Sequence, residues 1–270
     1  MNKITLVPAI ARKLGDLVLD GVVGTATGNQ IIDQRIVAEV DNQMKGYQFY
    51  CYQGQAFNQA LTIVANIVGS LNFTVAPSFA TIPTVGDKYL ITKRFGYNDY
   101  SSAIDEAVRR SLQLTLIPFS ATLSLVPTQY EYAIPTGFKF IHELHIVPSG
   151  STDYALENAY PLDRRAWSVS KNPSGTYTLY LDTRFFSPDW HDCDAVIIRG
   201  QRIPSSLTTP TTNAEVDDNF LIAYSAQVLS SRLIDEGQAW LQKFLAYKME
   251  ADKLESAIFS YPRASAVEII

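Results

Sequence analysis

The fold is decided by residues 102–116, SAIDEAVRRSLQLTL, a helical stretch between two blocks rich in β-type sequence. The stretch opens on a capping-box pattern, and apolar residues recur every four positions from Ile104 to Leu116. Pro118 then interrupts the pattern. We therefore predict a helix over residues 100–117, flanked on both sides by sheets.

Three further segments have a helical period, and they frame the rest of the chain. They cover residues 4–15, 217–234 and 238–260, while the β-type blocks cover 17–96 and 119–204. The first block contains about five or six short strands, which is typical of a small barrel or sandwich. The sequence predicts an α+β fold, a small helical bundle with two large β-rich insertions.

The predicted organisation follows from this alternation of helical and β-type sequence. The apolar stripes of the central and third helices need a common cover, so the four helices are expected to pack together. The third helix is apolar around more than half of its circumference, which predicts surface that only oligomerisation covers. The expected parts are a helical core from residues 1–16, 98–118 and 213–262, a first β lobe over 17–97, a second β lobe over 119–212 and a C-terminal arm over 263–270.

Composition excludes several classes of protein. The chain has 270 residues, of which 47% are hydrophobic, so it can bury a sizeable core. Its net charge of −5 disfavours binding to nucleic acid or to an anionic membrane. No apolar run reaches the ~20 residues that a membrane helix needs, and the first residues lack a secretory signal. Cys51 and Cys193 lie far apart, which suits a protein assembled in a reducing cytoplasm.

The sequence contains little that points to catalysis. Its densest group of metal-ligand residues is 189–194, DWHDCD, which we interpret as a polar loop because neighbours in one short loop rarely converge on one ion. His142 and His145 are three residues apart on a predicted strand, so their side chains should point to opposite faces. No nucleotide-binding, hydrolase or zinc motif occurs. We expect no enzyme activity, no catalytic residue, no metal and no cofactor.

Parts of the sequence also fit two specific classes of protein, which we keep as alternatives. The first is a tail or baseplate adhesion module that binds host glycans, for which the aromatic run 47–52 could form a sugar platform. The same run also fits a core strand and its cross-strand pairs. The second class is a glycan hydrolase, which needs two facing carboxylates such as Glu131 and Asp182.

A family resemblance rests on short segments that follow one another in a characteristic order. In sequence they are 10–16, 24–28, 73–77, 86–89, 132–138, 198–204 and 215–217, the last followed by an apolar helix. In this order they resemble the neck proteins of tailed bacteriophages, the head–tail connectors also called adaptors or head-completion proteins. The likeness spans nearly the whole chain. The chain departs from the simplest members of the family by carrying large β lobes.

The resemblance implies a structural protein of the virion, assembled in the cytoplasm of the host bacterium. Such proteins form a ring, usually twelvefold, that joins the portal to the tail and lines the path of the genome. The implied partners are the portal protein, tail or other neck proteins, and further copies of the chain itself. DNA would pass through without specific binding, which suits an acidic chain, and no membrane is involved.

The C-terminal end is the predicted partner-binding segment. Pro262 ends the last helix, and the apolar, β-prone residues beyond it can add to a sheet edge. We expect the arm to bind a neighbouring chain, above all the portal, so that deleting 264–270 spares folding and blocks assembly. The alternative is that the arm folds back on its own domain. The predicted partner-binding residues are Trp240, Phe259, Tyr261, Val267, Ile269 and Ile270.

Overall fold

The computed structural model divides the chain into two compact units. The first consists of Met1–Ser111 with Ser205–Ile258, and the second of Leu112–Pro204 with Phe259–Ile270. Helices and strands are both abundant, as an α+β fold requires. The residues that the structure describes are 1–35, 38–126, 128–148, 159–173, 175–182, 184, 193–259 and 266–269.

The first unit holds the four α-helices of the described chain. Helix α1 ends at Gly15, whose φ of 72° is the left-handed conformation that a glycine C-cap adopts. Helix α3 starts where the Asp217 carboxylate accepts a hydrogen bond from the backbone N–H of Phe220 at 3.0 Å. The helices are α1 (Lys3–Leu14), α2 (Tyr97–Leu112), α3 (Asp218–Ser231) and α4 (Gln238–Ile258), with a 3₁₀ turn, η4 (Ile234–Glu236), between the last two.

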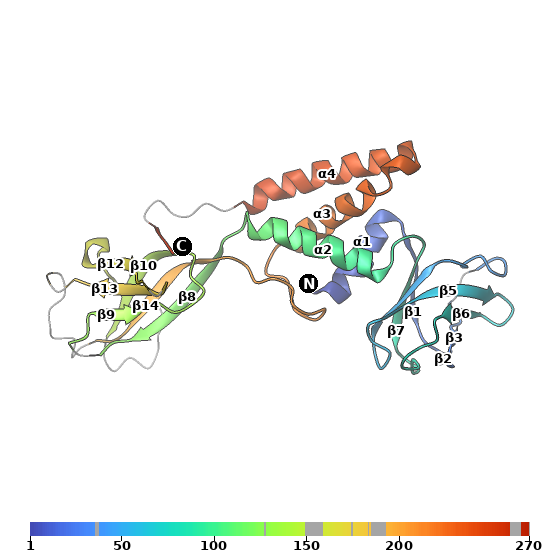
Figure 1. Cartoon of the computed structure of the whole chain (residues 1–270), viewed down its shortest axis with the longest axis horizontal. Helices are drawn as coiled ribbons and strands as arrows, with labels where there is room; N and C mark the ends of the chain where they lie inside the picture. Colours follow the sequence, from blue (N-terminus) through green and yellow to red (C-terminus); the bar gives the residue numbers. More distant parts are fainter. Residues whose placement is uncertain are drawn as a thin grey trace. The chain divides into compact units, whose positions relative to one another are not determined.

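Contacts and polar bonds connect these four helices to one another (Figure 1). Helix α3 packs against both α1 and α4. The Lys3 ammonium lies 2.7 Å from the Asp105 carboxylate, which joins α1 to α2. The Tyr247 hydroxyl of α4 donates to the carbonyl of Lys13 at 2.6 Å, and Arg110 of α2 forms an ion pair with a glutamate of α4, Glu255.

One seven-stranded antiparallel sheet forms the β part of the first unit. It curls into a half-barrel with the strand order β1-β7-β4-β5-β6-β3-β2. Its concave core contains Phe49, Phe73, Phe79 and Tyr89, whose rings lie between 5.2 and 5.6 Å apart where they meet Phe49. The strands are β1 (Leu17–Val22), β2 (Thr25–Ala26), β3 (Gln30–Ile32), β4 (Gln48–Gln53), β5 (Gln59–Ile67), β6 (Asn72–Ala76) and β7 (Lys88–Thr92).

A buried carboxylate ties this sheet to the helices. Asp16, which is 2% exposed, lies between α1 and β1. It accepts hydrogen bonds from the N–H groups of Arg94 and Phe95, at 3.0 and 3.2 Å, and from the Tyr100 hydroxyl at 2.6 Å. Because these donors lie between β7 and α2 or on α2, one side chain fixes where both helices leave the sheet.

The second unit contains two sheets around one apolar core. The larger has the strand order β11-β10-β14-β8, with β15 added to β10, and the smaller has the order β12-β13-β9. Both contribute to the core, which includes Ile141, Trp167, Leu179 and Ile198. The strands are β8 (Ile117–Ser124), β9 (Glu131–Ala133), β10 (Phe140–Pro148), β11 (Tyr160–Pro161), β12 (Trp167–Lys171), β13 (Tyr177–Leu181), β14 (Cys193–Arg202) and β15 (Val267–Glu268), with a 3₁₀ turn, η2 (Arg164–Ala166), before β12.

The structure corrects two details of the sequence prediction. Helix α2 begins at Tyr97, because the Asp99 carboxylate accepts from the backbone N–H of Gly96 at 3.0 Å and caps the helix there. It ends at Leu112, so Leu116 lies outside the helix, just before β8. The first β part has seven strands in the described chain, more than the five or six that we expected, because β2 and β3 are too short to give a sequence period.

Candidate interaction surfaces

The C-terminal arm lies on the edge of its own second unit. In β15, Val267 and Glu268 pair with Ile141 and Phe140 of β10. The backbone N–H of Ile269 donates to the carbonyl of Lys139 at 2.7 Å. The side chains of Val267 and Ile269 pack against the core of the unit. In the isolated chain the arm therefore folds back, which is the alternative interpretation of the sequence.

The other predicted partner-binding residues have different surroundings. Trp240 lies under two cations of its own chain, Arg94 at 5.4 Å and Lys243 at 4.4 Å from the ring centroid. Phe259 is 42% exposed, and Tyr261 and Ile270 lie outside the described residues. The structure therefore does not bring the six residues together into one described surface.

Helix α4 presents an apolar surface that the sequence analysis missed. Its 21 residues include one fully buried residue, Ala251. Leu241, Leu245 and Met249 follow one another at four-residue intervals and are 40%, 49% and 74% exposed. We call these three residues the α4 stripe. The four-residue spacing is visible in the sequence. It was overlooked because a longer row of apolar residues, from Trp240 to Ile258, defines the packed face of the same helix.

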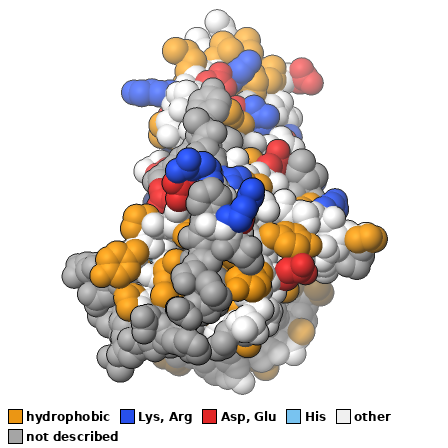
Figure 2. Space-filling view, turned by 90° about the vertical axis from the view of Figure 1, so that its left-hand side faces the viewer, with side chains coloured by type: hydrophobic (Ala, Val, Ile, Leu, Met, Phe, Trp, Pro, Cys, Tyr) orange, Lys and Arg blue, Asp and Glu red, His pale blue; other side chains and the backbone are white. Residues whose placement is uncertain are grey.

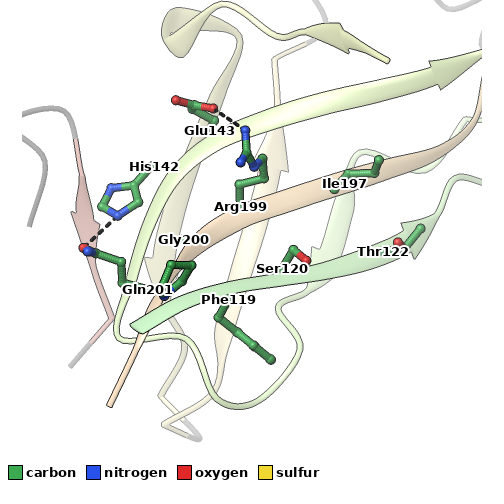
Figure 3. Close-up of a pocket in the computed structure, with 10 residues that line it drawn as sticks. Phe119, Ser120, Thr122, His142, Glu143, Ile197, Arg199, Gly200 and Gln201 are labelled. Carbon is green, nitrogen blue, oxygen red and sulfur yellow. Dashed lines mark hydrogen bonds and ion pairs between the residues drawn. The ribbon is translucent and has the colours of Figure 1, made fainter. Parts of the chain in front are cut away.

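A polar groove of about 400 Å³ runs over β8, β10 and β14 of the second unit (Figure 3). Ser120 and Thr122 of β8 lie along one side of it. Arg199 lies 3.5 Å from the Glu143 carboxylate, and a ring nitrogen of His142 lies 2.8 Å from the Gln201 side-chain oxygen. Four polar side chains of the groove therefore bond in two pairs, Arg199 with Glu143 and His142 with Gln201.

A β-bulge in β10 places His142 in this groove. The pairing of β10 with β14 shifts between Ile141 and Glu143, which makes His142 an extra residue in β10. Ile141 and Leu144 both enter the core, so His142, Glu143 and His145 share the opposite face. The His145 ring lies 3.2 Å from the Glu143 carboxylate. The prediction that His142 and His145 point to opposite faces is therefore wrong, because it assumed a regular strand.

The end of the second unit carries dispersed side chains of several kinds. In Figure 2, hydrophobic side chains are scattered over the described part of this end, and Lys, Arg, Asp and Glu side chains gather mainly near the middle of the view. Two local ion pairs belong to this unit, Asp163 with Arg165 at 3.0 Å and Asp182 with Arg184 at 2.7 Å. The Arg184 guanidinium lowers the pKa of Asp182, which is thereby engaged as an ion-pair partner.

The described residues contain no group of three or more side chains arranged to hold a metal ion. Of the predicted polar loop, residues 189–192 lie outside the described part of the chain. Cys193 is not in that loop, because it begins β14 opposite Pro148 and packs against the core. Burial raises the pKa of the Cys51 thiol to about 12, which keeps it protonated and unreactive. No described helix is long and apolar enough to span a membrane.

Comparison with known families decides the identity. The family model described as "SU10 adaptor protein" matches residues 87–265, about two thirds of the chain. The chain belongs to the SU10 adaptor protein family. This adaptor is therefore a structural protein of a bacteriophage virion, as the order of its sequence segments indicated. The match begins at β7 and covers helices α2, α3 and α4 together with the strands of the second β part except β15. No curated protein matches the chain.

Proposed function

We propose that this adaptor forms a homo-oligomeric ring in the phage neck, which joins the portal to the tail and surrounds the path of the DNA. Family membership supports a role between other virion proteins. The observation that carries the proposal is the α4 stripe, because three large apolar side chains exposed along one helix face mark a protein contact. The ring that the resemblance implies is a dodecamer.

In this proposal the helices α1–α4 form the common core of each subunit, and the α4 stripe packs against the neighbouring copy. Polar bonds hold α4 to α1 and α2 on its other faces, through Lys13 with Glu250 at 2.6 Å and Arg110 with Glu255. The stripe can therefore be covered by a neighbour without disturbing the contacts that fold the subunit. Because the acidic chain repels phosphate, DNA passes through the ring without specific binding.

The arm supplies the second contact of the proposal. We infer that the arm, residues 263–270, leaves the β10 edge during assembly and binds the portal or a neighbouring subunit. The contacts on β10 show what the arm can do, since it adds as a strand and inserts Val267 and Ile269 into an apolar core. A partner that offers an equivalent edge and core would take it up.

Charge placed on the α4 stripe tests the ring. Leu245→Lys should leave the subunit folded, since the side chain is half exposed, and should abolish rings in electron micrographs of the purified protein. Ala246→Lys is the matched control, because residue 246 is exposed and lies about 100° around the helix. Rings that persist in Leu245→Lys, or rings lost equally in both variants, would contradict the assignment of the stripe.

A further inference from the structure

The larger sheet of the second unit ends in two short strands on one side and in one long strand, β8, on the other. At one end of the sheet, β11 and β15 both pair with β10. At the other end, β8 pairs with β14 along all eight of its residues. Among the described residues, no strand pairs with the second edge of β8. That edge presents backbone donors and acceptors which a further strand can bind.

Strand β8 has few of the features that protect an open edge. The chain contains no Asp, Glu, Lys or Arg from Ser111 to Tyr130, a charge-free run of 20 residues around β8. The pairing with β14 runs residue for residue, without a bulge. Edge strands are usually guarded by charged residues, bulges or proline, and β8 has only Pro118, near its start.

The core beside β8 is also incomplete. Its inward-facing residues, Ile117, Phe119, Ala121 and Leu123, are all only partly buried. On the neighbouring strand β14, Val196 and Ile198 are 0% exposed. An added strand would therefore bind the open backbone and cover this apolar row at the same time.

The chemistry of the edge selects its partner. The fitting strand is uncharged, at least five residues long, and alternates apolar with small polar residues. The other described edge strands do not fit, because β1 contains Asp20, β9 contains Glu131, β12 ends at Lys171, and β2, β11 and β15 have two residues each. Among the described edge strands of this chain, the one that fits the open edge of β8 is therefore β8 of a second copy.

We propose that β8 pairs antiparallel with β8 of a second copy, about a two-fold axis at Ser120. Phe119 then lies opposite Ala121 of the second copy, which combines a large and a small core residue, and Ile117 lies opposite Leu123. Ser120 lies opposite Ser120. The nearest charges in the sequence, Arg110 and Glu131, are almost equally far from Ser120 and lie outside the paired strands. The missing N–H of Pro118 removes one hydrogen bond from each half of the ribbon.

This contact is separate from the proposed ring and does not depend on it. A two-fold interface is complete with two copies, whereas a ring needs a head-to-tail interface. The β8 pairing therefore belongs to the unassembled protein, in which it would shield an edge that otherwise promotes aggregation.

Cysteine cross-linking tests the register. In a Cys193→Ser background, Ser120→Cys should give a disulfide-linked dimer on mild oxidation, because directly opposite Cα atoms lie about 5.5 Å apart in such a pair. Ser124→Cys is the control. In the same register its two copies would be eight residues out of step, about 26 Å apart, and should not cross-link. Failure of Ser120→Cys to cross-link, or equal cross-linking of both variants, overturns the proposal.

Sedimentation measures the same contact without cysteines. In a Leu245→Lys background, which removes the proposed ring contact, the protein should show a concentration-dependent dimer, and adding Ser120→Lys should raise its dissociation constant at least about tenfold by placing two ammonium groups opposite each other. Ser170→Lys, at an exposed position on β12, should leave the dimer unchanged. A protein that stays monomeric, or a dimer that Ser120→Lys does not weaken, contradicts the pairing. Loss of the ring alone would leave these results unaffected.

Discussion

At the scale of single residues, three buried or partly buried carboxylates organise the first unit. Asp16 joins both helices to the sheet, Asp33 binds the Tyr89 hydroxyl at 2.8 Å, and Asp87 accepts the N–H of Ala56 at 3.0 Å. In each case a carboxylate satisfies groups from segments far apart in the chain. Sequence patterns cannot reveal such roles, because an aspartate in a loop reads as a turn residue or a cap until its donors are known.

Asp16→Ala should destabilise the first unit strongly. The change removes the acceptor for three hydrogen bonds and leaves buried donors unsatisfied, which should lower the free energy of unfolding by about 3 kcal/mol or more. Urea denaturation followed by circular dichroism measures the difference. Asp235→Ala, at an exposed position, is the control and should change stability by less than about 0.5 kcal/mol. Equal stability of the two variants would show that Asp16 is dispensable.

The first unit should lose stability in acid. Burial raises the pKa of Asp87, but hydrogen bonds from Ala56 and Thr84 outweigh this and hold the pKa below the ordinary value for an aspartate. Burial also raises the pKa of Asp33. Hydrogen bonds from Arg35 and Tyr89 lower it by more, so the pKa of Asp33 is lowered as well. A lowered folded-state pKa gives stability that is present above about pH 4 and is lost as the pH falls through the folded-state value.

Denaturation at several pH values between 2.5 and 7, all about one unit apart, checks this linkage. The free energy of unfolding should be nearly flat above about pH 5 and fall below about pH 4. In Asp87→Asn the fall should be smaller, since one of the titrating groups is gone. An identical acid profile in the variant would contradict the role given to Asp87.

At the scale of elements, the sequence predicts what a regular period reveals and misses what interrupts one. The four helices lie within a few residues of their predicted ranges, because apolar spacing and caps such as Asp217 identify them. The bulge at His142 could not be predicted, since one inserted residue reverses the facing of every later residue on β10. The sequence also left undecided whether Val267 pairs with its own chain, because that pairing depends on β10, a strand more than 120 residues away.

Locking the arm on β10 should block assembly without unfolding the protein. Phe140 and Glu268 are directly paired, so Phe140→Cys with Glu268→Cys, in a Cys193→Ser background, should form a disulfide within one chain. We expect the oxidised protein to fail in assembly onto portal-bearing heads and the reduced protein to recover. Glu268→Cys alone is the control. Normal assembly of the oxidised protein would show that the arm stays on β10.

Deleting residues 264–270 should now cost stability, contrary to the expectation from sequence. Val267 and Ile269 pack against the core of the second unit, and their loss should lower its free energy of unfolding by about 1–3 kcal/mol. Thermal unfolding of the truncated and full-length proteins gives the comparison. Val267→Thr, which keeps the β-branched shape, is the milder variant and should lose less. No change on deletion would indicate that the arm contributes nothing to the fold.

At the scale of the whole molecule, the sequence indicated the right family because it presents the segments of an adaptor in order. The family model confirms this over residues 87–265, although each segment is short. The interaction surfaces were harder to predict. Exposure of Leu241, Leu245 and Met249 depends on which face of α4 the other helices cover, and the open edge of β8 depends on the order of strands in the sheet. The spacing of residues along the sequence predicts neither the exposure of the α4 stripe nor the open edge of β8.

The central claim is that this adaptor forms a ring between the portal and the tail, and cryo-electron microscopy of the intact virion tests it most directly. The account predicts a closed ring of copies on the axis of the neck, surrounding the DNA path, with the α4 stripe of each copy buried against its neighbour. Density for this chain at the baseplate or in fibres, or copies in the neck whose α4 stripes face solvent, would contradict it.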